Sequence, residues 1–336
     1  MSEHTRREFL WKTIPGVALA GVGLTALQPL AVPEAEAQQP AAAPRDPRSY
    51  LGTRYGLELD GQFAGWIESA QGGDATAPVV LEKLGADNIQ HKHLAGVKYE
   101  DIVVSCGTGM SKSFYEWIKA TFEKKFVRKN GAIIAFDYNV RPVSRLEWAN
   151  GLITEVGFPA CDVASKNLAR MTIKITPMVT RTAGPTLGKP SEAVRKQWLP
   201  ANFRLQIAGC PAACTRVNKI EAITVKTAVV EYAAGSERSY NTIPAHLEVP
   251  NLAVTTLDPA EFYQWLQDFV IKGNNGADRE KTGTLEFLAP DQKEALFTLT
   301  FRGLGIFKLT PEAGNEMVPR ATAEMYCEDI GFAYSA

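Results

Sequence analysis

The feature that most constrains the fold is a weak internal repeat. The pentad FYEWI at Phe114–Ile118 reappears as FYQWL at Phe262–Leu266. Five further matches occur, and their order along the chain is the same in both halves. They are YGLELDG (55–61) with FRLQIAG (203–209), VVLE (79–82) with VVE (229–231), HL (93–94) with HL (246–247), NGAII (130–134) with TGTLE (282–286), and RLEW (145–148) with LTF (299–301). With Trp148 aligned to Phe301, all six pairs are separated by 148 to 153 residues. Because chance rarely supplies six matches in one order, we predict two tandem copies of one domain.

Composition sets the boundaries of these copies. The first domain is expected at residues 50–180 and the second at 201–336. Residues 38–49 form a linker by composition, since they are proline, alanine and polar residues without periodicity. Residues 181–200 carry prolines and glycines without a strand pattern, so they form a connector, with a short helix expected at Ser191–Trp198.

Each copy is predicted to hold many strands and one helix. A strand ends at Gly61 or Gly209, where glycine supplies the positive φ of a hairpin turn. Apolar residues then recur at helical spacing behind Ser111 and behind Asp258, which suit a helix N-cap. The expected core residues of the two helices are Phe114, Trp117, Ile118, Phe262, Trp265 and Leu266. The fold class is therefore mainly β with one helix per domain, in two small β-sandwich or barrel domains.

This order of elements resembles that of the tail-tube proteins of contractile phages and related injection systems. The resemblance rests on YGLELDG and FRLQIAG, HLAGVKYEDIVVS, SFYEWIKATF, RKNGAIIAF, RLEWANGLITEVGFPACDVASKN and ARMTIKITP. The first copy matches this pattern over nearly its whole length. The second copy matches it over the hairpin and the helix and departs from it after Gly303.

The resemblance implies a barrel-like domain whose sheets join those of its neighbours in a ring, and rings that stack into a hollow tube. Family members place six domains in a ring, so two domains per chain imply a ring of three chains. Pairing around a closed ring also covers strand edges that would otherwise stay exposed. The expected partner is therefore the protein itself, as a trimer that forms a six-domain ring, with tail or injection-system components as further partners.

The first 37 residues have the order of an export signal. A basic pair precedes Phe-Leu, then a Gly- and Ala-rich apolar run and an A-x-A-like processing site. The residues that carry this pattern are Arg6, Arg7, Phe9, Leu10, Ala35 and Ala37. We expect export through the twin-arginine route to the periplasm or the outside, with membrane contact only during export. The alternative is cytoplasmic assembly into a phage-tail-like particle.

Bulk charge excludes one class of partner. Removal of residues 1–37 takes three basic and four acidic residues from totals of 36 and 37, which leaves 33 of each. A chain without net charge has no general attraction to nucleic acid, so we expect no specific nucleic-acid partner.

Cys210 and Cys214 form the sharpest local motif, CPAAC, directly after Gly209. Three interpretations stay open: two free thiols, a local disulfide formed after export, and a metal or redox site. The pair His91 and His93 is too small a ligand set for a metal site, and a polar loop is the simpler interpretation.

No sequence motif proposes a reaction. Phosphate-binding loops, dinucleotide fingerprints, nucleophile elbows and zinc-protease motifs are all missing from the sequence. We therefore predict no catalytic, cofactor-binding or metal-binding residues, no cofactor, and no enzyme activity. The expected function is that of a tail-tube-like structural protein that self-assembles into rings or tubes. The alternative is an exported binding protein or cofactor-carrying enzyme that reuses the fold, which should show a pocket with perturbed titratable groups.

Overall fold

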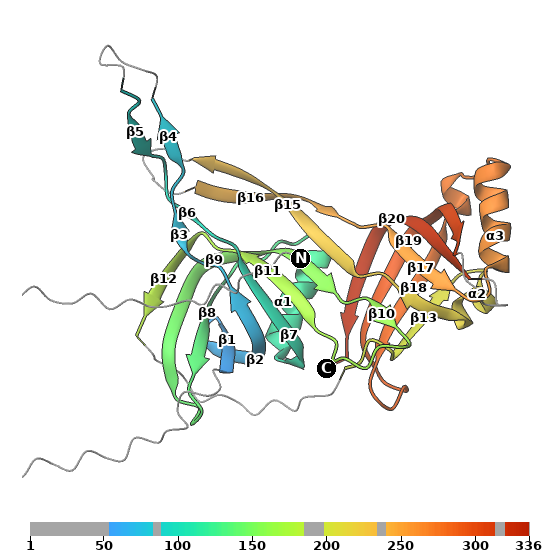
Figure 1. Cartoon of the computed structure of the whole chain (residues 1–336), viewed down its shortest axis with the longest axis horizontal. Coiled ribbons are helices and arrows are strands. Elements are labelled where there is room, and N and C mark those ends of the chain that lie inside the picture. Colours follow the sequence, from blue (N-terminus) through green and yellow to red (C-terminus); the bar gives the residue numbers. More distant parts are fainter. Residues whose placement is uncertain (1–53, 83–88, 185–197, 234–239, 313–319, 336) are drawn as a thin grey trace, which may run out of the picture. The chain divides into compact units, whose positions relative to one another are not determined.

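The computed structural model describes residues 54–82, 89–184, 198–233, 240–312 and 320–335. Strands dominate this part of the chain, with three short α-helices, so the mainly-β prediction is confirmed (Figure 1). The expected signal, the linker at 38–49 and the connector helix up to residue 197 lie outside the described residues.

The first half of the chain forms a closed barrel. Its strands are β1 (Arg54–Leu59), β2 (Gln62–Gln71), β7 (Ile102–Met110), β8 (Lys129–Phe136), β9 (Pro142–Phe158) and β11 (Met171–Thr176). They pair antiparallel in the order β11-β7-β2-β1-β8-β9, and β11 also pairs with β9, which closes the sheet. Strand β12 (Val179–Ala183) pairs with an earlier stretch of β9. Closure leaves no free edge among these six strands over the paired stretches.

Alternation of side chains explains why these segments form a barrel wall. In β11 the residues Met171, Ile173 and Ile175 are buried, and the residues between them are more exposed. The turn between β1 and β2 has positive φ at Asp60 and Gly61, as a two-residue hairpin of type I′ requires.

Helix α1 (Lys112–Phe122) packs on this barrel. It begins behind Ser111, whose hydroxyl accepts a hydrogen bond from the backbone N–H of Phe114 at 3.4 Å. Phe114, Trp117 and Ile118 are all buried, where the helical spacing of the sequence places them.

The second half of the chain forms a similar sheet that stays open. Its strands are β13 (Phe203–Ile207), β14 (Val217–Ile220), β17 (Leu252–Thr256), β18 (Lys281–Leu288), β19 (Ala295–Pro311) and β20 (Ala321–Tyr334). They pair in the order β14-β17-β20-β19-β18-β13, and the short strand β10 (Cys161–Asp162) of the first half adds to β14.

The hairpin expected after Gly209 does not form, and this expectation was wrong. Helix α2 (Pro211–Thr215) follows the turn instead, so β13 and β14 do not pair. Proline lacks the N–H that a ladder needs, and it suits the first position of a helix. The alanines that follow are good helix formers, so the CPAAC motif winds into a helical turn.

Helix α3 (Ala260–Leu266) and the π-helix η1 (Gln267–Ile271) occupy the place in the second half that α1 has in the first. Phe262 and Trp265 are buried, whereas Leu266 is only partly buried. A short 3-10 helix, η2 (Ala277–Arg279), leads into β18.

The two sheets share their neighbour order and their ladder irregularities. In the first sheet the β8–β9 register shifts between Lys129 and Gly131, and in the second the β18–β19 register shifts between Lys281 and Gly283. Five of the six pairings in the first barrel have an equivalent in the second sheet, and the missing one is β13 with β14.

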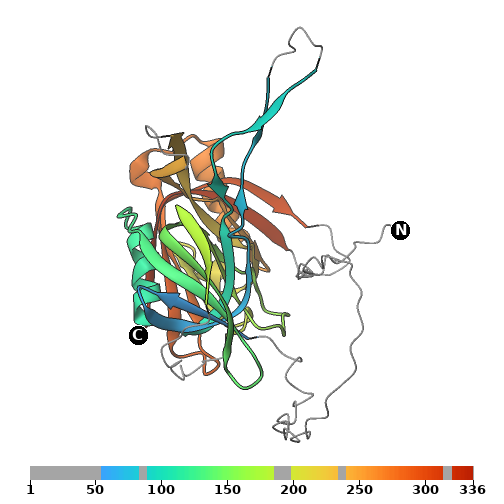
Figure 2. The same ribbon diagram turned by 90° about the vertical axis from the view of Figure 1, so that its left-hand side faces the viewer.

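Each half also carries a long hairpin between its second and third barrel strands. In the second half it consists of β15 (Ile223–Ala233) and β16 (Tyr240–Glu248). In the first half it consists of four short strands: β3 (Ala75–Thr76) with β6 (Lys98–Tyr99), and β4 (Val79–Leu81) with β5 (Lys92–Leu94). Figure 2 shows strands β4 and β5 of the first hairpin extending away from the barrels.

Candidate assembly interface

The hairpin of the second half extends the sheet of the first half. Residues Ile223–Lys226 of β15 pair antiparallel with Glu155–Phe158 of β9. The apolar side chains Val156, Phe158, Ile223 and Val225 are almost completely buried at this junction. A strand edge of one barrel is therefore covered by a strand that the other half supplies.

Helix α1 forms the second part of this contact, because its outer face packs on β20 and β19. The Tyr115 ring stacks on that of Tyr334 with centroids 5.1 Å apart, and Phe122 lies 5.5 Å from Phe332. Beside them, the ammonium of Lys124 lies 3.1 Å from a carboxylate oxygen of Asp329. Burial raises the pKa of Asp329, but hydrogen bonds from Lys124 and Arg302 outweigh it and leave the pKa below its ordinary value.

Polar contacts connect the hairpin regions of the two halves. Arg128 donates to the backbone carbonyl of Thr242, and its other amino group donates to the carbonyl of Asn150 at 2.9 Å. Lys98 pairs with Glu231 and lies over the ring of Tyr240 at 4.7 Å. These contacts fix where the second hairpin lies along the first barrel.

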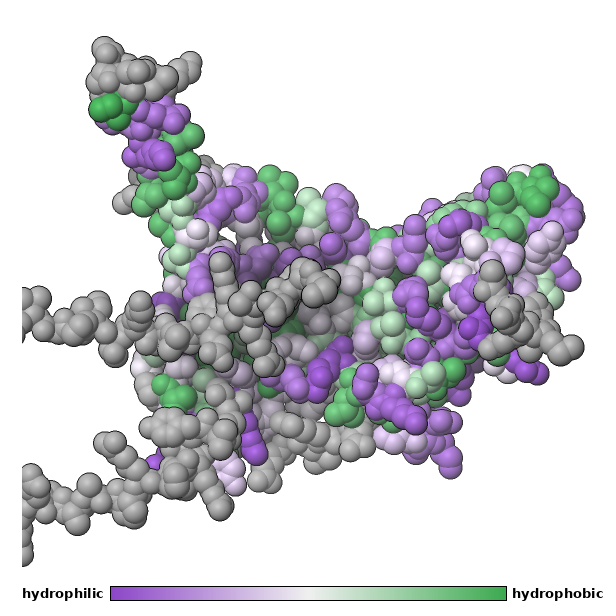
Figure 3. Space-filling view, viewed as in Figure 1, coloured by the Kyte–Doolittle hydropathy of each residue, from purple (hydrophilic) through white to green (hydrophobic). Residues whose placement is uncertain are grey.

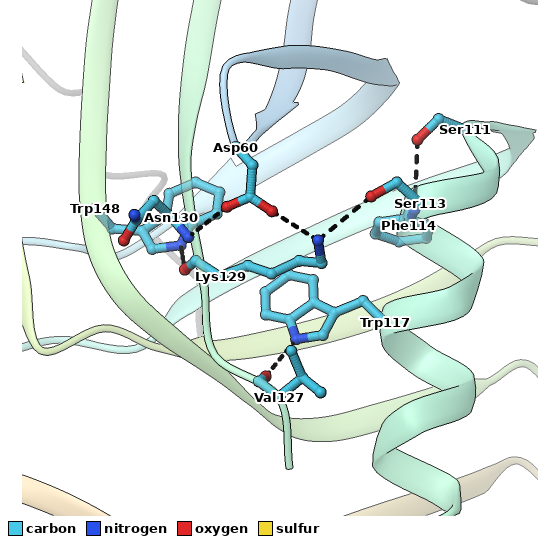
Figure 4. A network of polar contacts seen from close by, with 9 residues as sticks. All are labelled: Asp60, Ser111, Ser113, Phe114, Trp117, Val127, Lys129, Asn130 and Trp148. Atoms are coloured by element: carbon cyan, nitrogen blue, oxygen red, sulfur yellow. Dashed lines mark hydrogen bonds and ion pairs between the residues drawn. The ribbon is translucent and has the colours of Figure 1, made fainter. Parts of the chain in front are cut away.

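A network at the start of α1 holds the helix on its own barrel (Figure 4). Lys129 pairs with Asp60 at 2.6 Å and donates to the hydroxyl of Ser113 at 3.4 Å. The indole N–H of Trp117 donates to the carbonyl of Val127 at 2.7 Å. The helix is thus anchored to the first barrel at one face, which presents its opposite face to the second half.

A concave surface of about 620 Å³ lies on the first barrel beside a buried ion pair. The Arg145 guanidinium donates to both oxygens of Glu58, one of them at 2.9 Å, and its Nε donates to Glu147 at 2.7 Å. Hydrogen bonding to Glu58 raises the pKa of Arg145, and hydrogen bonds from Arg145 and Arg181 lower the pKa of Glu147. Each shift favours the charged form, so neither group is poised to exchange a proton near neutral pH.

The thiols of Cys210, the N-cap residue of α2, and Cys214, within α2, are free and buried. Burial raises the pKa of Cys214 to about 11 and also raises that of Cys210. Among the described residues, no group of three or more His, Cys, Asp or Glu side chains could hold a metal ion. The disulfide between these two cysteines stays a prediction.

His93 lies on β5 and forms an ion-pair contact of 3.4 Å with Glu82 if it is protonated, and both side chains are more than half exposed. His91 lies at the start of this hairpin arm and is exposed. The six predicted signal residues, from Arg6 to Ala37, lie outside the described part of the chain. In the part of the chain that is described, no helix is both long and apolar enough to cross a membrane.

Sequence reasoning missed the residues that join the two halves. Tyr115 and Phe122 lie on the outer face of α1, and the helical pattern alone does not reveal their partner. One signal was available: α1 is apolar over more of its circumference than a helix packed on a single barrel requires.

The geometry defines a class of protein: mainly-β barrels that carry a helix and extend their sheets by strand addition. Residues 52–177 match the model of the family described as T4-like virus tail tube protein gp19. This family is structural and not enzymatic, in agreement with the prediction that the chain is not an enzyme. No curated protein matches the sequence.

Several solved structures are similar to part of the chain. One is the sheath-tube complex of an extracellular contractile injection system, PVC, in its extended state, at 15% identity and TM-score 0.35, covering 39% of this chain and 88% of that one. Another is the tube-terminating cap of the anti-feeding prophage, at 18% identity and TM-score 0.35, covering 44% and 97%. A third is Hcp1 from Flavobacterium johnsoniae, at 15% identity and TM-score 0.24, covering 40% and 95%.

Proposed function

We propose that the chain is a tail-tube-like structural protein with two tandem tube domains, and that its copies assemble head to tail into closed rings that stack into a tube. The family match over residues 52–177 supports the tube-like character of the first domain. The second domain and the assembly rest on the strand pairing within the chain.

The proposal of tandem copies is supported by matching ladders. Leu57 pairs with Ile133 in the first sheet, and Leu205 pairs with Leu285 in the second. The hairpins match as well, since Val80 faces His93 and Val230 faces Ile243, each position shifted by 150 residues. We call positions that match in this way counterparts. This register makes Ile243 the counterpart of His93, so the expected match of His93–Leu94 with His246–Leu247 was wrong by three residues.

One observation carries the proposal of assembly. Within the chain, β15 pairs with residues Glu155–Phe158 of β9. The counterpart of Glu155–Phe158 in the second half is Lys308–Pro311 of β19. The assignment follows from a register shift that both strands share, between Ile153 and Glu155 in β9 and between Ile306 and Lys308 in β19. This stretch pairs with β20 on one side and with no described strand on the other. An unpaired edge that is covered in one copy and open in the other fits a head-to-tail series.

A head-to-tail series closes into a ring when the rotation per step divides a full turn. Six domains per ring, as in the tail tubes that the chain resembles, correspond to three chains of two domains. Every open edge of β19 is then covered by the hairpin of the next chain.

Negative-stain electron microscopy of residues 38–336 tests this function. We expect rings or tubes with pseudo-sixfold symmetry at micromolar concentration. A protein that stays monomeric at every concentration tried would contradict the proposal and favour the alternative of an exported binding protein or a cofactor-carrying enzyme.

We further propose that the protein reaches its working compartment through the twin-arginine route. The motif formed by Arg6, Arg7, Phe9 and Leu10 supports this route. Replacing both arginines with lysine should retain the protein in the cytoplasm, whereas the unchanged chain should appear in the periplasmic or extracellular fraction. Equal distribution of the two forms would contradict export by this route and favour cytoplasmic assembly.

A further inference from the structure

We infer that α3, η1 and the outer end of β19 form the surface that binds the first half of a second copy of this chain. The inference rests on the proposed ring and assigns its intermolecular contact. The inference is drawn from pairs of counterpart residues. In each pair, one residue is buried in the contact between the two halves, and the other is exposed.

The helices show this difference most clearly. On α1, the side chains of Tyr115 and Phe122 are 6% and 4% exposed because the second half covers them. Their counterparts, Tyr263 and Val270, are 58% and 45% exposed, although both helices bury the face toward their own barrel. Ile271 adds to this patch, and Figure 3 shows apolar side chains over α3 on the surface.

The strand edge shows the same difference. In the covered copy, Thr154 is buried, whereas its counterpart on β19, Phe307, is 40% exposed. Within the chain, Ile223–Lys226 covers the edge of β9. Its counterpart is residues 73–76, which include β3, so the registers of the two sheets assign residues 73–76 of a second copy to Lys308–Pro311. In that pairing Thr76 of one chain lies opposite Lys308 of the other, as Lys226 lies opposite Glu155 within the chain.

The receiving surface for the helix lies on β9 and β12, the counterparts of β19 and the end of β20. Val179 is 41% exposed, but it lies on the opposite face of β12, where it lines the same hollow as Glu147 and Arg181. Ser144 and Thr182 hold the places that Phe297 and Phe332 have in the second half. The receiving surface is therefore less aromatic than the one within the chain, because a serine and a threonine replace two phenylalanines.

Charge at the hairpin supports the same partner. Arg128 donates to the carbonyl of Thr242 within the chain. The counterparts of these two residues are Glu280 and Lys92, which carry opposite charges. The hydroxyl of Tyr326 donates a hydrogen bond of 2.7 Å to Glu280, which holds the Glu280 carboxylate in place on the second half. Lys92 lies exposed on β5.

Disulfide trapping tests the register. Opposed positions in an antiparallel pair have Cα atoms about 4.5 to 5.5 Å apart, which suits a disulfide. We expect the variant with Thr76→Cys and Lys308→Cys to give covalent dimers and trimers under mild oxidation. A mixture of the two single variants should give only dimers. The matched control, Thr76→Cys with Thr298→Cys, should give neither.

The outcomes separate the two proposals. Assembly into rings without this cross-link overturns the assigned contact and leaves the ring intact. Failure of the unchanged chain to assemble overturns both. Cross-linking in the control pair to the same extent would show random collision and would also overturn the assignment.

A matched pair of surface variants gives a test that needs no cross-link. Val270→Glu places a charge in the proposed contact, and Val163→Glu does the same to a similarly exposed valine outside it. We expect Val270→Glu to raise the protein concentration needed for assembly at least tenfold and Val163→Glu to leave it unchanged. The thermal midpoints of the two monomers should be equal. Equal assembly of both variants would contradict the inference.

Discussion

Tyr115 of α1 stacks on Tyr334 near the chain terminus, with ring planes 25° apart and centroids separated by 5.1 Å. The Tyr115 hydroxyl donates to the carbonyl of Thr108 at 2.8 Å, and burial raises its pKa. Phe297 lies 5.5 Å from the same ring. This cluster connects the helix of the first half to the sheet of the second.

Tyr115→Ala should destabilise the folded chain by about 3 kcal/mol, because it removes a buried aromatic ring and leaves a cavity between the halves. Urea unfolding followed by circular dichroism measures the change. The counterpart variant Tyr263→Ala should cost under about 0.5 kcal/mol, since that ring is largely exposed in the single chain. Similar losses in both variants would show that the two helices face equivalent surroundings.

Glu58→Ala should cost about 3 to 5 kcal/mol, because it leaves the Arg145 guanidinium buried without its main partner. The free energy of unfolding, obtained from denaturant titration, measures this cost. Gln206 is the counterpart of Glu58 on β13 and is exposed, so Gln206→Ala serves as the control and should change stability little. A loss below about 1 kcal/mol for Glu58→Ala would contradict the structural role of the pair.

Asp329 predicts a pH dependence of the contact between the halves. Its pKa is lower in the folded chain than in the unfolded one, so its contribution is fully present above the unfolded value near 3.8 and is lost as pH falls through the folded value. Asp329→Asn removes the ion pairs with Lys124 and Arg302, so it should cost about 1 kcal/mol of stability at pH 7. Because the variant lacks this carboxylate, its stability should fall less steeply than that of the unchanged chain as the pH drops below 5. Thermal midpoints measured from pH 3 to pH 7 check this, and parallel curves for the two proteins would contradict it.

The thiols predict a pattern of chemical reactivity. Burial raises the pKa of Cys106 and Cys161 to about 12, and both side chains are buried, so they should resist a thiol reagent at pH 8. Cys327 is partly exposed and should react first. All five cysteines should react after unfolding in denaturant. A count of three in unfolded, unreduced protein would instead reveal a disulfide between Cys210 and Cys214.

The sequence was sufficient to predict the mainly-β class and the buried face of α1. Phe114, Trp117 and Ile118 recur at helical spacing, and side chains of this kind on one face are almost always buried in a folded domain. The two-residue turn at Asp60 and Gly61 was also readable, because a positive φ at both positions favours these residue types.

The contacts between the halves were not readable in this way. A strand pattern reports which side chains are buried but not which strand lies alongside, so the pairing of β15 with β9 was invisible. Helix α2 was missed because a single helical turn has too few residues for a periodic signal, and the glycine before it also suits a hairpin. The ion pair of Glu58 with Arg145 joins residues far apart in sequence, which local patterns do not connect.

Native mass spectrometry of residues 38–336 tests the central claim most directly, because the claim specifies a ring of three two-domain chains. We expect a dominant species of three times the chain mass, together with multiples of it where rings stack. A species of six chains with no trimer would contradict a ring in which each chain supplies two of the six domains. A monomer alone would contradict the assembly itself.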